Sequence, residues 1–109
     1  GGDQQDQWSL HFFLKHVHFN LNLQEAIDSP DFNTAHFPNS FYPRETDLGS
    51  LFIENRFPNR TVKHLIKKGH NLIVEQAWSL GRMTAASSNK GILKAAANPR
   101  YMQGYAIGR

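Results

Sequence analysis

Apolar side chains dominate the beginning of the chain and recur there with a helical period. Between residues 6 and 19 they return every three or four positions, which is the spacing of one face of an α-helix. Two neighbouring apolar stripes result, one of Trp8, Phe12 and Phe19 and the other of Leu10, Leu14, Val17 and Leu21. Because apolar residues then cover most of the circumference, the pattern predicts a helix over 6–19 that is buried between two layers.

Short apolar runs separated by turn residues predict two more helices and several strands. Asn22 is placed to cap a short helix over 23–28, which Pro30 closes. A third helix is expected over 58–68 with Gly69 as its left-handed cap, and its inward side chains are predicted to be Val62, Leu65 and Ile66. The predicted strands are 32–37, 50–54 and 72–75, followed by a hairpin of 83–88 and 92–96.

This order of elements is typical of an α+β domain in which helices pack on a mainly antiparallel sheet. The 109 residues suffice for one domain. Hydrophobic residues make up only 39%, and they include eight Phe, three Tyr and two Trp, so the core is expected to rely on a few large rings. The sequence contains no run of about 18 apolar residues, so no membrane span is expected.

Charge and candidate ligands change this picture little. The net charge of +3 comes from scattered basic residues, with Lys67-Lys68 as the only adjacent pair, which favours a solvated surface over a nucleic-acid partner. His16 and His18 point about 200° apart on a helix, so they cannot share a metal ion. Cysteine is absent, which excludes disulfides and thiolate metal sites. No metal and no other cofactor is expected.

The strongest chemical signal is the glycine pair Gly1-Gly2 ahead of the first predicted helix. Glycine amides can approach an anion without obstruction by a side chain, and the positive end of the helix dipole favours negative charge at this place. A self-contained domain has no evident use for such a pair at its first residues. We therefore expect the chain to be cut from a longer one at a site that matters.

Further short motifs follow along the chain. Residues 22–30 read Asn-Leu-Gln-Glu-Ala-Ile-Asp-Ser-Pro, residues 54–58 read Glu-Asn-Arg-Phe-Pro, and residues 67–70 read Lys-Lys-Gly-His. The tail contains Ala-Ala-Asn-Pro-Arg at 96–100 and then Gly104. In this order, and together with Gly1-Gly2-Asp3, these segments resemble the gamma-glutamyltransferase family of the N-terminal-nucleophile hydrolase superfamily. Each motif is weak alone, but five in the right order across the whole chain are specific.

The resemblance implies a partial αββα sandwich, with residues 1–109 forming the C-terminal part of the small subunit. In the family, a precursor cuts itself into a large and a small subunit, and the new N-terminal Thr is the nucleophile with its own amine as base. The threonines of this chain match no nucleophile motif: Thr34, Thr46, Thr61 and Thr84. The isolated chain is therefore expected to be inactive, with the rest of the small subunit and the large subunit as its partners.

The resemblance carries over one catalytic element, the backbone of Gly1 and Gly2, which implies an oxyanion hole. Asp3 departs from the residue often found after the glycine pair and is a candidate for substrate binding. Asn98 stands where the family usually has Asp, and we expect a structural role for it. Arg44, Glu45 and Asp47 fit a solvated loop better than a substrate entrance.

The intact enzyme is expected to transfer or hydrolyse a γ-glutamyl amide such as glutathione, with water or an amino acid as acceptor. Two alternatives stay open from the sequence. One is a family member that acts on a different amide, and the other is a small stand-alone interaction module without catalysis that binds an acidic partner. The compartment stays undecided.

Overall fold

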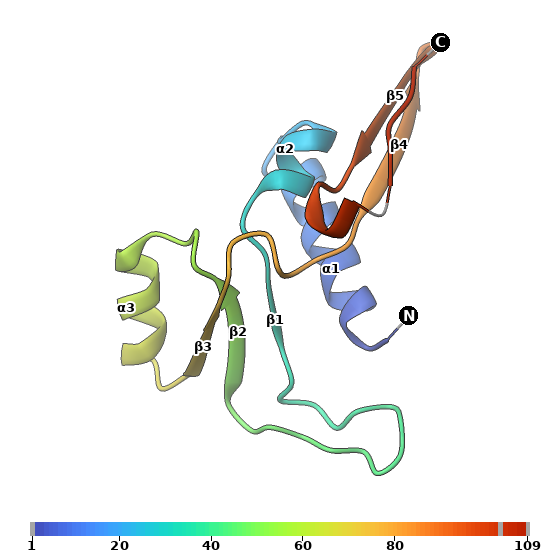
Figure 1. The fold of residues 1–109 in the computed structure, drawn as a ribbon. Coiled ribbons are helices and arrows are strands. Elements are labelled where there is room, and N and C mark those ends of the chain that lie inside the picture. The colour runs from blue at the N-terminus through green and yellow to red at the C-terminus, as the bar shows by residue number, and fades with distance from the viewer. Residues whose placement is uncertain (1, 103, 109) are drawn as a thin grey trace.

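A computed structural model describes residues 2–102 and 104–108 of the chain. Figure 1 shows its helices and strands in space. In chain order the elements are α1 (Gln4–Phe13), the π-helical turn η1 (Leu14–His18), α2 (Leu23–Asp28), β1 (Phe32–Thr34), β2 (Ser50–Glu54), α3 (Asn59–Lys67), β3 (Asn71–Glu75), β4 (Thr84–Asn89), β5 (Ile92–Ala97) and the short 3₁₀ turn η2 (Arg100–Met102).

The first helix differs from its sequence-based prediction in extent and in burial. It begins at Gln4 rather than at residue 6, and after Phe13 it continues as the wider turn η1. None of the described residues of α1 and η1 is buried, and the side chains of Leu10 and Phe13 are 55% and 51% exposed. The prediction of a helix buried between two layers is therefore wrong for the described part of the chain, because Phe12 packs on the core cluster of Leu23, Ile27 and Ala96 while Leu10 and Phe13 stay exposed.

The second helix agrees with the sequence in both its bounds and its cap. Asn22 accepts a hydrogen bond from the Glu25 amide on its side chain, and the Glu25 carboxylate accepts one from the Asn22 amide, each at 2.9 Å. This reciprocal pair satisfies two amides that a helix start otherwise leaves free. Leu23 and Ile27 are buried, together with Ala96 of β5, so α2 packs on the hairpin.

The strands form two separate sheets, whereas the sequence predicts a single one. One sheet has the order β1-β2-β3, with β1 antiparallel and β3 parallel to β2, and the other is the antiparallel hairpin β4-β5. Two of the three strand pairings are antiparallel, so the predicted α+β class with mainly antiparallel pairing is confirmed. Figure 1 shows the connection from β3 to β4 crossing from one sheet to the other.

The helix between β2 and β3 makes their parallel pairing possible, because parallel neighbours need a crossover connection. At its end the His70 amide bonds to the Leu65 carbonyl at 3.3 Å and the Gly69 amide to the Ile66 carbonyl at 2.9 Å, which is a Schellman motif. Gly69 has φ +90°, so its predicted role as left-handed cap is confirmed. The prediction that Ile66 faces inward is wrong, because its side chain is 57% exposed.

The strand β1 is shorter than predicted because the chain turns away from the sheet after Thr34. The Thr34 hydroxyl donates to the Ser50 carbonyl at 2.6 Å and accepts from the His36 amide at 3.1 Å, which bends the backbone outward. The hairpin turn, in contrast, lies where the sequence predicts it. Lys90 and Gly91 both have positive φ, +48° and +79°, as the tight two-residue turns of hairpins require.

Candidate functional site

Gly2 lies immediately before the first turn of α1. Its carbonyl accepts a hydrogen bond from the Gln5 amide at 3.0 Å, so Gly2 belongs to the helix start. A Cβ at this position would meet Gln4 Oε1 at 3.6 Å, an ordinary contact. The surroundings therefore have space for a side chain, and what glycine provides here is an unobstructed approach to the main chain. Gly1 lies outside the described residues.

The first turn of α1 keeps its amides free of the usual side-chain cap. Among the described residues, Asp3 is at the capping position, but its side chain makes no capping hydrogen bond. Instead its carboxylate accepts hydrogen bonds from the Ser40 amide at 2.7 Å and from the Ser40 hydroxyl. These bonds, that of the hydroxyl above all, lower the pKa of Asp3. Asp3 thus ties the helix start to the loop that follows β1.

A pocket of about 650 Å³ opens between the start of α1 and this loop. Glu45 and Asp47 line it, together with Asp3 and Asp6, so its charge is acidic. The sequence favoured a solvated loop for Glu45 and Asp47, and the structure brings both to the wall of a hollow beside the helix start. Arg44 is exposed and is not among the described residues that line it. Such a wall suits groups that carry positive charge or donate hydrogen bonds.

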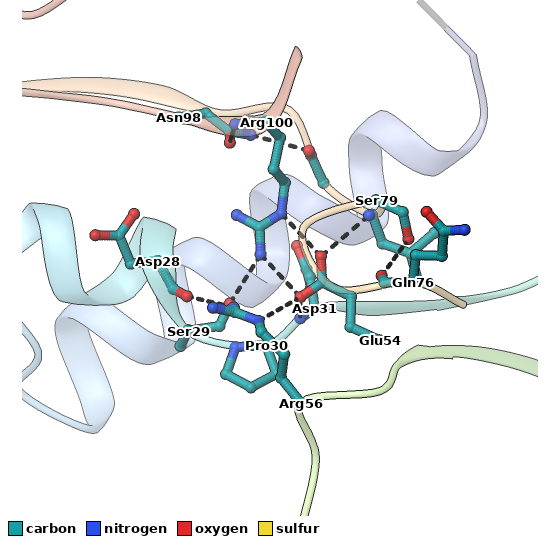
Figure 2. A network of polar contacts seen from close by, with 12 residues as sticks. Asp28, Ser29, Pro30, Asp31, Glu54, Arg56, Gln76, Ser79, Asn98 and Arg100 are labelled. Atoms are coloured by element: carbon teal, nitrogen blue, oxygen red, sulfur yellow. Dashed lines mark hydrogen bonds and ion pairs between the residues drawn. The ribbon is translucent and has the colours of Figure 1, made fainter. Parts of the chain in front are cut away.

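A second polar cluster, buried at the junction of the two sheets, contains Glu54, Arg56 and Arg100. Figure 2 shows the two arginines reaching the Glu54 carboxylate from opposite sides. Arg100 donates from Nε to Glu54 Oε1 at 2.9 Å and from Nη2 to Oε2 at 3.1 Å, and Arg56 Nε donates to Oε2 at 3.2 Å. Glu54 is fully buried and Arg100 is 2% exposed.

The Glu54 carboxylate has its acceptor positions filled by the protein itself. Besides the arginines, the Leu80 amide donates to Oε1 at 3.1 Å and the Asp31 amide to Oε2 at 3.3 Å. Burial raises the pKa of Glu54, but the hydrogen bonds from Arg100, Leu80 and Asp31 and the charge of Arg100 together outweigh it and hold that pKa below its usual value. A carboxylate that is ionised at neutral pH and has its acceptor positions filled by the protein has no place for a substrate, so the cluster is structural.

Asn98 joins the same cluster. Its side-chain amide donates to the Gly81 carbonyl at 2.9 Å, and its side-chain oxygen accepts from the Arg100 amide at 2.6 Å. A carboxylate could accept but could not donate here. The sequence showed the motifs around Glu54 and Asn98 only as points of resemblance to the family. It did not reveal that the two motifs contact each other.

His16 and His18 make separate contacts and do not share a ligand. His16 Nδ1 lies 2.8 Å from the Leu21 carbonyl oxygen, while His18 is exposed beside the ring of Phe13. In residues 2–102 and 104–108, no three metal-ligating side chains come together. None of the helices in that part of the chain has the length and apolar character needed to cross a membrane.

The fold is similar to that of several solved structures. A structure of LmbA2991 is 49% identical, with a TM-score of 0.92, and the match covers 100% of this chain and 20% of that one. The gamma-glutamyltranspeptidase from Pseudomonas nitroreducens is 17% identical over 95% of this chain and 48% of its own, with a TM-score of 0.69. The cephalosporin acylase from Bacillus halodurans is 23% identical over 86% of this chain and 16% of its own, with a TM-score of 0.68.

The chain therefore spans about a fifth of LmbA2991 and about half of the Pseudomonas enzyme. The matches to the Pseudomonas enzyme and to the cephalosporin acylase are below 25% identity and show the fold alone, which is part of an N-terminal-nucleophile hydrolase. No curated protein sequence matches the chain. The sequence profile of the family described as Gamma-glutamyltranspeptidase matches residues 1–108. Since this match covers almost every residue, the chain belongs to the gamma-glutamyltranspeptidase family.

Proposed function

We propose that this chain is part of an enzyme that transfers or hydrolyses γ-glutamyl amides through an N-terminal Thr nucleophile located elsewhere in the polypeptide. Membership of the family over residues 1–108 supports an enzyme of this kind. The observation that carries the proposal is the position of Gly2 beside Asp3, the residue at the capping position of α1, whose side chain does not cap the first turn of the helix. Backbone amides at such a place are free to donate to a developing anion.

The proposed role of Gly1 and Gly2 follows from the reaction. The Thr hydroxyl oxygen attacks the γ-carbonyl carbon while the Thr amine takes the proton, and the carbonyl oxygen becomes an oxyanion. Backbone N–H groups of the glycine pair donate to this oxyanion, and the dipole of α1 adds positive potential. The C–N bond then breaks, the leaving amine takes the proton, and water or an amino acid releases the glutamyl group from the Thr ester.

Asp3 is proposed as a substrate-binding residue, secondary to the glycine pair. Its carboxylate lies at the helix start and on the wall of the acidic pocket. Ser40 occupies one position on each oxygen, and each oxygen has a further lone pair that can accept from a substrate ammonium group. A γ-glutamyl donor such as glutathione has an ammonium group, as do amino-acid acceptors. Another amide with a nearby ammonium group fits equally well.

The remainder of the small subunit and the large subunit are the proposed partners of this chain. The relatives are longer, since the chain spans 20% of LmbA2991 and 48% of the Pseudomonas enzyme. The outer side of α1 and η1 exposes apolar side chains that another layer of the same enzyme can cover, with Leu10 at 55%, Phe13 at 51% and Val17 at 49%.

Gly2→Val in the full-length precursor tests the oxyanion role. Because the Cβ fits without a clash, folding and maturation should survive. We expect kcat to fall by about 10²–10³ and KM to change little, as when one oxyanion donor is lost in comparable acyl-transfer sites. Steady-state kinetics with a chromogenic γ-glutamyl anilide measure both constants. A matured, folded Gly2→Val enzyme with wild-type kcat would remove the oxyanion role from this glycine.

A further inference from the structure

One face of the first helix carries three polar side chains spaced by a single turn. Gln7, His11 and Lys15 stand at positions i, i+4 and i+8, so they lie above one another along α1 and η1. All three bind the segment 30–34, which contains β1. Lys15 donates to the Pro30 carbonyl at 3.2 Å, and His11 Nδ1 lies 2.9 Å from Asp31 Oδ1.

Gln7 makes the most regular of these contacts. Its Nε2 donates to the Thr34 carbonyl at 2.9 Å, and its Oε1 accepts from the Thr34 amide, also at 2.9 Å. The side-chain amide thus occupies the donor and acceptor of one residue of β1, as a neighbouring strand would. Thr34 is itself held to β2 through its hydroxyl, which donates to the Ser50 carbonyl at 2.6 Å.

The position of α1 along β1 therefore depends on directional bonds. Phe12 packs against the buried cluster of Leu23, Ile27 and Ala96, and the His11 ring stacks on that of Phe32 with 4.0 Å between ring centroids. These contacts hold the helix against its neighbours but do not by themselves fix its position along β1. Apolar contact is non-directional and tolerates sliding, whereas hydrogen bonds weaken steeply when distance or angle changes. Of the three polar contacts, that of Gln7 lies nearest to Gly2 in the chain. It holds the helix start against β1, while the Asp3–Ser40 bonds tie the same helix start to the loop after β1.

We infer that Gln7 is a positioning residue for the reaction: its paired hydrogen bonds with the Thr34 backbone hold the first turn of α1, and with it the Gly2 amide, at the place of the oxyanion. This inference rests on the proposed function. An oxyanion donor acts only within about 2.7–3.1 Å of the oxygen, and a displacement of about 1 Å can cost 10²-fold in rate. Loss of the Gln7 contact should therefore reduce kcat, while substrate binding by residues elsewhere is retained.

Gln7→Glu in the full-length protein tests the inference. An ionised carboxylate still accepts from the Thr34 amide, but it turns an anionic oxygen toward the Thr34 carbonyl in place of a donor. We expect kcat to fall by about 10- to 100-fold with KM within about twofold of wild type. Protonation of the introduced carboxyl group restores a donor, so the ratio of variant to wild-type kcat should rise as the pH is lowered.

The ratio of variant to wild-type kcat separates the effect of the introduced carboxyl group from the effects of the acidic residues around it. Asp3, Asp6, Glu45 and Asp47 line the same pocket in both proteins, so their contribution to kcat is common to the numerator and the denominator of the ratio. Gln7→Met is the second variant, because it removes both hydrogen bonds without adding charge. It should lower kcat without recovery at low pH, and it keeps the inference testable if Gln7→Glu does not mature.

Gln24→Glu is the matched control. Gln24 Nε2 also donates to a backbone carbonyl, that of Ala97 at 3.1 Å, but Gln24 lies on α2 and contacts neither α1 nor β1 through this bond. Its substitution should lower the melting temperature and leave kcat unchanged. If both Gln7 variants lose stability as Gln24→Glu does and keep wild-type kcat, Gln7 is only structural.

Comparison with Gly2→Val distinguishes the two possible failures. If Gly2→Val impairs kcat and the folded Gln7 variants do not, the positioning role is wrong and the oxyanion role stands. If Gly2→Val itself has wild-type kcat, the proposed oxyanion role fails and the positioning role of Gln7 fails with it.

Discussion

The Glu54 carboxylate ties together segments that are distant in the sequence. It accepts hydrogen bonds from the Asp31 amide at the start of β1, from the Leu80 amide in the β3–β4 connection, and from Arg100 in the tail. Arg100 extends the connection further, because its Nη1 donates to the Ile27 carbonyl at 2.8 Å. The two sheets are therefore joined by charge-assisted bonds centred on one side chain.

Glu54→Gln should destabilise the protein strongly. The amide has almost the same shape, but it leaves the charge of the buried Arg100 without its partner, which typically costs about 3–5 kcal/mol. Urea unfolding of the full-length protein measures the change. The control is Glu75→Gln on β3, the residue paired with Glu54 in the sheet, which is only half-buried. Equal effects of the two substitutions would contradict a special role of Glu54.

Stability should also fall in acid because of two carboxylates. Burial is the largest single influence and raises the pKa of Glu54 and of Asp31. The hydrogen bonds and positive charges around each carboxylate, led by Arg100 at Glu54 and by His11 and Lys15 at Asp31, together outweigh it, so both pKa values lie below the ordinary 4.5 and 3.8. A lowered folded-state pKa contributes stability that is present above the ordinary value and is lost as the pH falls through the folded value.

The expected profile is a free energy of unfolding that decreases between about pH 4.5 and pH 2. Urea midpoints measured across this range give the slope. In Glu54→Gln the decrease should be smaller, because one of the two groups no longer titrates. An unchanged slope in this variant would assign the acid sensitivity to other groups.

At the scale of elements, the end of α3 depends on the backbone of one glycine. Gly69 has φ +90°, and a Cβ there would meet nothing within 4 Å, so any cost of a side chain comes from the backbone conformation rather than from a clash. Gly69→Val should therefore destabilise the protein by about 1–3 kcal/mol. The melting temperature should fall, while kcat of the folded enzyme stays at the wild-type value.

Gly69→Asn is the matched variant, since Asn tolerates the left-handed region better than a β-branched residue. It should recover much of the melting temperature lost in Gly69→Val. This pattern is the reverse of that expected for Gly2→Val, which should change kcat and not stability. A loss of kcat in Gly69→Val without a loss of stability would contradict this assignment of roles.

At the scale of the whole molecule, apolar side chains stay exposed on several elements. On the first helix and its π-helical turn, Leu10, Phe13 and Val17 are 55%, 51% and 49% exposed, and in the tail Tyr105 and Ile107 are 76% and 84% exposed. Exposed apolar surface of this kind promotes association. The 109-residue chain expressed alone should therefore self-associate, which light scattering after size-exclusion chromatography measures.

Replacing Leu10 and Phe13 with Ser should reduce this association. Leu48→Ser is the control, because Leu48 is 71% exposed on the loop after β1 and not on α1. A monodisperse monomer of the unaltered chain that binds no dye specific for apolar surface would contradict the expectation and favour a self-sufficient module.

The sequence by itself determined the features whose interacting groups lie within a few residues of one another. The helix cap at Asn22, the turn at Lys90-Gly91 and the left-handed cap at Gly69 were all predicted correctly. Each needs only the conformational preferences of a short segment. The order of five short motifs was likewise enough to indicate the family, which the match over residues 1–108 confirmed.

Only the tertiary structure decided which distant residues meet. Glu54 and Arg100 are 46 positions apart, Asp3 and Ser40 are 37 apart, and Gln7 and Thr34 are 27 apart. The helical period of the first segment predicted its conformation but not its burial, because burial depends on what the rest of the molecule places against each face. Local patterns contain no information about that placement, so the polar face through which Gln7 binds β1 became visible only in three dimensions.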